Sequence, residues 1–132
     1  LDEIALVVSR IEPDGRLRVV KSGGMMPHKM GERLVDILGD KDVVPGVVSF
    51  GAGHVSPNGQ AMTWDDCFVM TGLSEPQLRD AGVHEGAAMV PIRAGRGPVL
   101  LGDPGDPLLA AWTFDDRMGV VTLLRLLEEI KR

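Results

Sequence analysis

Residues 4–21, with the sequence IALVVSRI-EPDG-RLRVVK, decide the fold class. Two runs rich in β-branched residues flank the sequence Pro13-Asp14-Gly15. In such a turn proline presets φ and glycine accepts a positive φ. The pattern therefore predicts a β-hairpin.

A second hairpin is predicted further along the chain. Residues 33–38 and 43–50 are again apolar and β-branched, and they flank Gly39-Asp40-Lys41-Asp42. Pro45 and Gly46 interrupt the later run, which is typical of an edge strand or of a β-bulge.

The rest of the chain predicts more short strands and two helices. Ser74, with Gln77 at capping-box spacing, begins a short helix that stops at Gly82. A second helix is expected to start at the segment Asp115-Asp116-Arg117 and to run to the last residue. Many short strands joined by glycine and proline turns indicate a closed or half-closed β-barrel. The further strands are expected over residues 66–71, 87–93, 98–101 and 107–114.

The terminal helix is apolar around most of its circumference, and such a helix is normally covered on several sides. One small barrel covers one face, so we expect either another element of a longer protein or a second copy of the chain against it. The chain also starts without methionine and ends inside a helical pattern, which is expected of an internal piece of a longer protein. The apolar positions are Val120, Val121, Leu123, Leu124, Leu126, Leu127 and Ile130.

Bulk composition narrows the class of protein. The 132 residues suffice for one domain and an appended element, and 44% of them are apolar. A net charge of −5 argues against a nucleic-acid partner, and no apolar run is long enough to span a bilayer. The single cysteine, Cys67, excludes an internal disulfide, fits a reducing cytoplasm and is expected to be buried.

Chemistry is suggested by Asp115-Asp116-Arg117, at the predicted start of the terminal helix. Adjacent carboxylates repel each other unless a positive charge lies nearby, and carboxylate oxygens suit divalent cations. The alternative is that both acids only cap the helix, where its N-terminal dipole favours negative charge.

Other candidate residues are scattered. Asp2 opens a strand; it is either a solvated strand end or an acid that holds a histidine ligand lying just before this chain. His28, His54 and His84 show no metal-binding spacing, so a self-contained metal hydrolase built from them is a minor alternative. His54 is the most interesting of the three, because Gly51-Ala52-Gly53-His54 places an imidazole on the glycine-rich loop of residues 51–63.

Together these residues resemble the tetrahedral-complex metallo-aminopeptidases, which include glutamyl and deblocking aminopeptidases and some proteins once labelled endoglucanases. The resemblance extends over essentially the whole chain, and its order along the chain carries more weight than any one motif. The most specific match is Phe114–Gly119, similar to the family's "A-L-D-D-R-x-G". The other matches are Leu1–Ile4, Asp14-Gly15, Gly23-Gly24, Gly31–Val35, Pro45–Val48, Gly53–Val55 and Ser74–Gly86.

The resemblance implies a small six-stranded Greek-key barrel, the lid or dimerisation domain, inserted into an α/β catalytic domain. Residues 1–106 would form the barrel, and residues 107–132 the strand and first helix that return to the catalytic domain. It further implies that dimers assemble into a tetrahedral dodecamer and that the substrates are peptides.

The resemblance also implies roles for single residues. Asp115 would bridge two divalent metal ions, zinc or cobalt, and Asp116 would follow it through a peptide bond that is often cis in the family. Asp2 would orient the histidine ligand that precedes this chain, and His54 would lie in a loop on the substrate side. The remaining ligands and the general base would lie beyond Arg132, so this chain alone is expected to be inactive and to bind no metal tightly. The alternative function is a non-catalytic β-barrel adaptor or oligomerisation module.

Overall fold

The computed structural model describes residues 6–51, 62–112 and 114–131, and these divide into two compact units. The first unit contains the described residues up to Ile92, and the second contains those from Arg93 onward. The strands of the first unit are β1 (Leu6–Ile11), β2 (Leu17–Lys21), β3 (Arg33–Leu38), β4 (Val43–Ser49), β5 (Phe68–Met70) and β6 (Ala88–Pro91).

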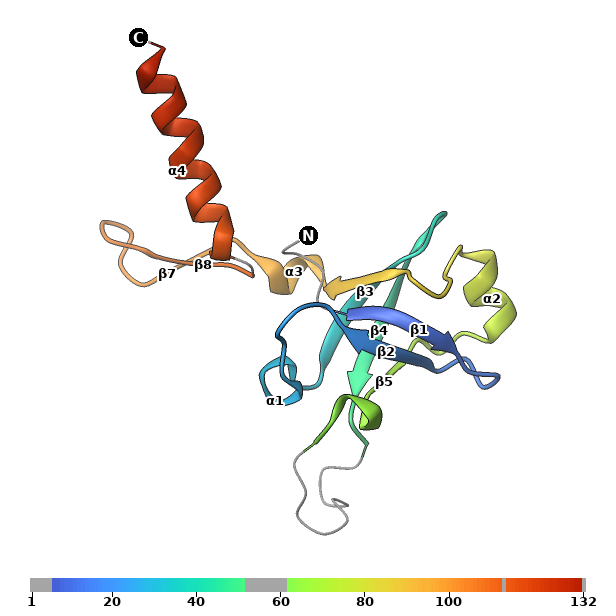
Figure 1. The fold of residues 1–132 in the computed structure, drawn as a ribbon. Coiled ribbons are helices and arrows are strands. Elements are labelled where there is room, and N and C mark those ends of the chain that lie inside the picture. Colours follow the sequence, from blue (N-terminus) through green and yellow to red (C-terminus); the bar gives the residue numbers. More distant parts are fainter. Residues whose placement is uncertain (1–5, 52–61, 113, 132) are drawn as a thin grey trace. The chain divides into compact units, whose positions relative to one another are not determined.

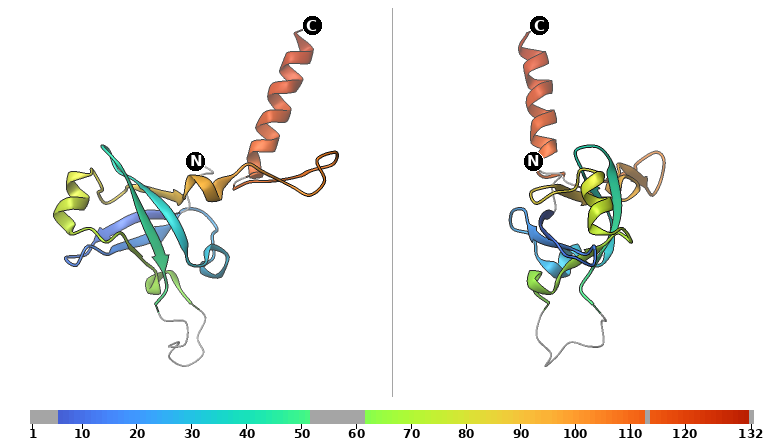
Figure 2. Two further views of the ribbon diagram at one scale, coloured as in Figure 1. Left: turned by 180° about the vertical axis from the view of Figure 1, so that it is seen from behind. Right: turned by 90° about the vertical axis from the view of Figure 1, so that its right-hand side faces the viewer.

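The six strands of the first unit form a closed antiparallel barrel in the order β1-β2-β5-β4-β3-β6. Figure 1 shows the β1–β2 hairpin in front, and from behind the teal strands β3 and β4 close the opposite side (Figure 2). Strands β3, β4 and β5 are neighbours in sequence order, and β6 returns to pair with β3, which is the Greek-key pattern. The predicted barrel class is confirmed.

Alternation of buried and exposed side chains builds the barrel core. In β4, Val44, Gly46 and Val48 are buried, whereas Val43 and Val47 are exposed. This two-residue period places every second side chain inside the barrel. The largest side chains that are fully buried are Leu6, Leu17, Met30, Ile37, Leu78 and Met89.

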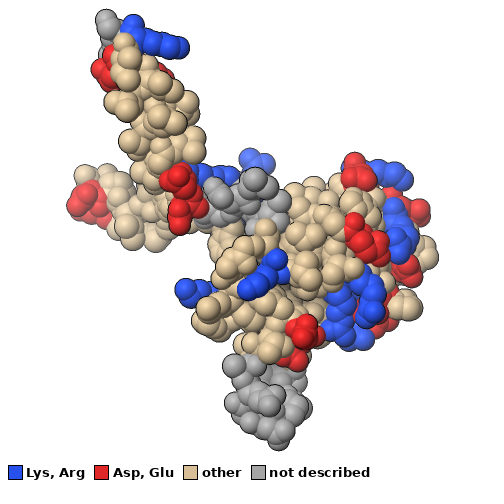
Figure 3. All heavy atoms as spheres, viewed as in Figure 1, with Lys and Arg blue, Asp and Glu red and all other residues tan. Residues whose placement is uncertain are grey.

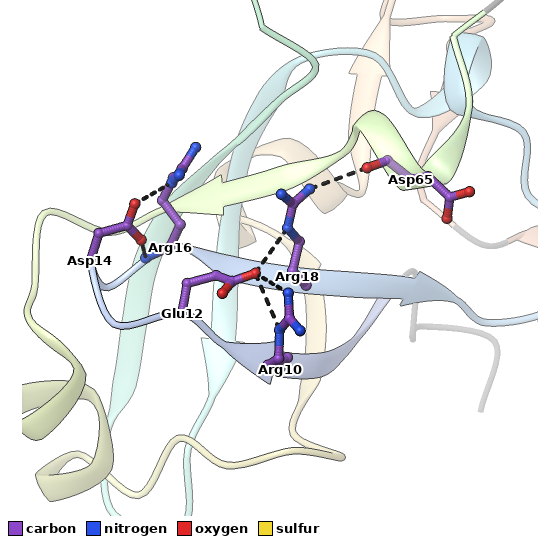
Figure 4. A network of polar contacts seen from close by, with 6 residues as sticks. All are labelled: Arg10, Glu12, Asp14, Arg16, Arg18 and Asp65. Carbon is purple, nitrogen blue, oxygen red and sulfur yellow. Dashed lines mark hydrogen bonds and ion pairs between the residues drawn. The ribbon is translucent and has the colours of Figure 1, made fainter.

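The predicted turn between β1 and β2 is present. Gly15 has φ 82°, and a Cβ there would collide with the Leu73 carbonyl oxygen, so the position requires glycine on both counts. Beside the turn, Figure 4 shows the Glu12 carboxylate accepting hydrogen bonds from Arg10 and Arg18. The Arg10 hydrogen bond, followed by that of Arg18, lowers the pKa of Glu12. These contacts lie at the barrel surface, where ion pairs contribute little to stability.

Strand β4 differs from the prediction of an edge position or a bulge at Pro45 and Gly46. It pairs with β3 in an uninterrupted register and with β5 from Val47 onward, so it is an interior strand without a bulge at these residues. Pro45 precedes the stretch that pairs with β5, so its missing N–H removes no hydrogen bond from that ladder. The bulge of this sheet lies in β1, between Val8 and Arg10.

Helix α2 (Glu75–Asp80) begins as its sequence predicts. Ser74 and Gln77 form a reciprocal capping box, and Leu78 packs into the core. Cys67 is buried just before β5, and burial raises the pKa of its thiol to about 11. Two elements that the sequence did not predict are the four-residue helix α1 (Pro27–Met30) and the 3₁₀ turn η2 (Trp64–Asp66).

The second unit consists of a short helix, a hairpin and a long helix. These are α3 (Arg93–Arg96), β7 (Val99–Leu101), β8 (Leu108–Ala110) and α4 (Phe114–Ile130). Strands β7 and β8 pair with each other alone, and β8 is shorter than the predicted strand because Phe114 already belongs to α4. Helix α3 was not predicted.

Helix α4 exposes most of its apolar side chains. Eight large hydrophobic residues on it are between 46% and 72% exposed, and Figure 3 shows the helix as a largely uncharged column. No helix among the parts of the chain that the structure describes is long and apolar enough to cross a membrane.

Candidate functional site

The start of α4 carries the acidic pair that the sequence singled out. Asp115 (φ −88°, ψ 109°) and Asp116 (φ −116°, ψ 34°) are not helical, so the regular helix begins at Arg117. The peptide bond between the two acids is cis, as the family resemblance implies.

Asp116 is the N-cap of this helix. Its Oδ1 accepts a hydrogen bond of 3.1 Å from the backbone N–H of Gly119, three residues further on. This is the usual geometry by which an aspartate satisfies one of the free amides of the first turn. The capping interpretation is therefore right for Asp116.

Asp115 behaves differently from its neighbour. Its side chain is exposed, and it forms no hydrogen bond or ion pair with any residue that the structure describes. Capping therefore accounts for one carboxylate of the pair and leaves the other available. An open carboxylate fits a divalent cation, which prefers oxygen or nitrogen donors, but a site needs three or four donors.

Arg117, the third residue of the motif, belongs to a different part of the site. With Arg93, Arg96 and Trp112 it lines a cavity of about 230 Å³ within the second unit. The backbone N–H of Trp112 donates to the Arg96 carbonyl over 2.7 Å, which ties the segment after β8 to α3. Arg96, Trp112 and Arg117 each have at least one further interaction.

The histidines that the structure describes do not form a metal centre. His28 lies in α1, while His84 follows α2, with its Nε2 3.5 Å from Asp40 Oδ1 and its Nδ1 2.8 Å from the Glu85 carbonyl. No group of three His, Cys, Asp or Glu side chains within residues 6–51, 62–112 and 114–131 could hold a metal ion. Two other candidates, Asp2 and His54, lie outside the described residues.

Sequence reasoning assigned no function to Gly119, although it quoted the residue within the motif. The spacing was available, because Gly119 is three residues after Asp116 and an N-cap side chain binds the backbone amide two or three residues further on.

The family model for M42 glutamyl aminopeptidases matches residues 1–132, which is the whole chain. The chain belongs to the M42 glutamyl aminopeptidase family. A curated relative is SgcX of Escherichia coli (strain K12), named as an aminopeptidase, which is 27% identical over 134 residues that include 98% of this chain.

Solved structures give the same M42 fold. Aminopeptidase APDkam598 from the archaeon Desulfurococcus kamchatkensis superimposes with a TM-score of 0.77 at 29% identity, over 96% of this chain. PhTET1-12s, described as a dodecamer, superimposes with a TM-score of 0.74 at 23% identity, also over 96% of this chain. The chain spans only about a third of these M42 relatives: 34% of SgcX, 34% of APDkam598 and 36% of PhTET1-12s.

Proposed function

We propose that this chain is part of a two-metal aminopeptidase that removes N-terminal residues from peptides. Residues 1–106 would be its lid and oligomerisation barrel, and residues 107–132 would be the strand and helix that return to an α/β peptidase domain. The observation that carries the proposal is the open carboxylate of Asp115, next to an acid that is already used as the N-cap of α4.

The residues of this chain would supply only some of the ligands that a divalent ion needs. Asp115 would bridge two metal ions, zinc or cobalt, while Asp2 would orient a histidine ligand. When bound, such a pair of ions lowers the pKa of a shared water and polarises the scissile carbonyl. One carboxylate cannot retain an ion by itself, so the other ligands and the general base would come from the rest of the longer protein.

Other residues of this chain would hold Asp115 in position. The cap between Asp116 and Gly119 fixes where α4 starts and so fixes the backbone that carries Asp115. Arg117 lines the cavity that it shares with α3, while His54 would approach the substrate from its loop.

The exposed apolar surface of α4 supports the same proposal. In a longer M42 protein, the α/β domain would cover Val120, Leu124 and Leu127, which are exposed here. A helix with this pattern is stable when other elements bury it.

The barrel would serve assembly into an oligomer, since the similar PhTET1-12s is a dodecamer. A reducing cytoplasm suits the single, buried Cys67.

The test compares two aspartates of the second unit in the full-length enzyme. Asp115→Ala should lower metal content and the cleavage of aminoacyl p-nitroanilides by more than the roughly 10–100-fold that follows loss of a group that only orients a ligand. Asp106→Ala removes another exposed carboxylate, from the β7–β8 hairpin, and should change neither quantity. Equal activity in both variants would refute the metal ligand and favour the non-catalytic adaptor.

The 132-residue chain provides a second arm of the test. In calorimetric titration with cobalt or zinc it should show no micromolar binding, and it should not cleave the p-nitroanilides. Binding that disappears in Asp115→Ala would mean that a complete site assembles within these residues or between copies of them, and would support a self-contained enzyme.

A further inference from the structure

We propose that Gly119 is a positioning residue for the metal site, because it leaves the space that the Asp116 carboxylate occupies over the first turn of α4. The inference rests on the proposed function, since it concerns how Asp115 is held. Neither the family comparison nor the proposed ligand set assigns any role to this glycine.

The contact is unusually close. A Cβ placed on Gly119 would collide with Asp116 Oδ1 and would lie 2.8 Å from its Cγ and 2.9 Å from its Oδ2. The added Cβ would thus lie closer to all three carboxylate atoms than a Cβ normally lies to a heavy atom of another residue. The carboxylate lies this close because Oδ1 accepts the Gly119 N–H at 3.1 Å.

Backbone conformation does not explain the glycine. Gly119 is absent from the glycines with positive φ, so an L-residue could adopt its backbone. Alanine is also the better helix former, by up to about 1 kcal/mol. Space for the Asp116 carboxylate is a physical reason for glycine at this position.

A methyl group at this position would affect Asp115 through Asp116. The Asp116 side chain would have to rotate away, and the first turn would lose its cap. Asp115 directly precedes the capping residue, so its carboxylate would lose its fixed place relative to the helix.

The experiment measures cobalt binding in the full-length enzyme for Gly119→Ala, Asp116→Ala, the double variant and Asp115→Ala. Cobalt affinity is obtained by competition with a chelator, and the visible absorption of the bound cobalt reports its ligand geometry. We expect Gly119→Ala to weaken cobalt binding about tenfold, the lower range for groups that orient a ligand, and to alter the cobalt spectrum. A merely structural role would leave that spectrum unchanged.

The double variant provides the decisive comparison. Because Gly119 acts through the Asp116 carboxylate, Gly119→Ala should have no further effect once Asp116 is alanine. Additive losses in the double variant, or affinity within twofold of wild type in Gly119→Ala, would overturn the inference while Asp115→Ala still loses its metal. If Asp115→Ala binds cobalt as wild type does, the proposed function itself fails, and the inference fails with it.

The metal-free full-length enzyme gives a check that needs no bound ion. Amide hydrogen exchange at position 119, expressed relative to the intrinsic rate of each residue, should be faster in Gly119→Ala than in wild type, since the N–H loses its acceptor. Unchanged protection of this amide would show that the cap tolerates the methyl group and would overturn the inference.

Discussion

Gly46→Ala is expected to destabilise the barrel, although alanine suits a strand better than glycine does. Gly46 lies in β4 opposite Val35 and faces the barrel interior. A Cβ at this position would lie 2.8 Å from Ile37 Cδ1, 2.8 Å from Val69 Cγ1 and 3.2 Å from the Met70 carbonyl oxygen. The methyl group would therefore enter a space that two side chains already fill.

The size of the effect follows from these distances. Carbon atoms in contact prefer about 3.5–4.0 Å, so both neighbours would have to retreat by roughly 1 Å. Ile37 and Val69 are fully buried and β-branched, which leaves them few alternative rotamers. Overpacking of this kind costs about 1–3 kcal/mol, and removal of glycine returns about 0.5–1 kcal/mol. We expect a net loss of about 1–2 kcal/mol in the free energy of unfolding.

The assay is urea unfolding of the 132-residue chain in a Trp112→Phe background, so that Trp64 fluorescence reports on the barrel unit. Gly24→Ala is the matched control, because its Cβ would meet nothing within 4 Å, and its stability should stay within about 0.5 kcal/mol of wild type. Ile37→Val removes the Cδ1 atom nearest to the new methyl group, so it should cost less in the Gly46→Ala background than alone. Equal stability of Gly46→Ala and wild type, or additive losses with Ile37→Val, would refute the packing argument.

Two further predictions concern titratable groups of the barrel unit. The hydrogen bond to the Glu85 carbonyl, followed by the charge of Asp40, raises the pKa of His84. Stability from His84 should therefore be complete below its ordinary pKa of about 6.5 and be lost as the pH rises through the raised value. Urea midpoints measured between about pH 5 and pH 8 should show this fall in wild type, and a His84→Gln variant with the same pH profile would contradict it. Burial raises the pKa of Cys67 to about 11, so Ellman's reagent at pH 8 should modify the folded chain at least about a hundredfold more slowly than the chain in guanidinium; similar rates in both would show that the thiol is accessible.

Local chemistry made the barrel hairpins and α2 predictable from the sequence. The Pro13-Asp14-Gly15 turn and the Ser74–Gln77 capping box each act within four residues, so their signals are complete in the sequence. Strand order is different, because pairing β2 with β5 and β6 with β3 brings together distant segments. The family resemblance supplied the Greek-key closure that the residue pattern left open.

The fold elements that the sequence did not predict correctly were either too short or depended on their surroundings in the barrel. Helices α1 and α3 have four residues each, too few for a periodic apolar pattern to appear. The prediction at Pro45 and Gly46 was wrong because both residues are tolerated for local reasons. Pro45 needs no N–H toward β5, and Gly46 makes room for Ile37 and Val69 inside the barrel.

The sequence singled out Asp115 and Asp116 as a pair, but it did not indicate which of the two caps the helix. Sequence reasoning weighed metal binding against helix capping for both residues together. The structure separates them, because the hydrogen bond to Gly119 fixes Asp116 as the cap and no described residue engages Asp115. Which acid caps depends on where the regular helix begins, and that point is set by backbone geometry that side-chain identity does not reveal.

Under the proposed function, one further domain would account for both the single carboxylate of Asp115 and the exposed apolar surface of α4. Asp115 is a single donor that requires further ligands, and α4 is an apolar helix that requires a cover. A domain that packs on α4 would hold its start in place and could bring the remaining ligands toward Asp115. Burial of α4 and binding of metal would then stabilise each other, because an ion that binds only the assembled site adds its binding free energy to folding. Removing the metal from the full-length enzyme should therefore increase hydrogen exchange along α4 while leaving the barrel core, around Leu6 and Met89, unchanged. Equal protection of α4 with and without metal would mean that the helix is covered independently of the site.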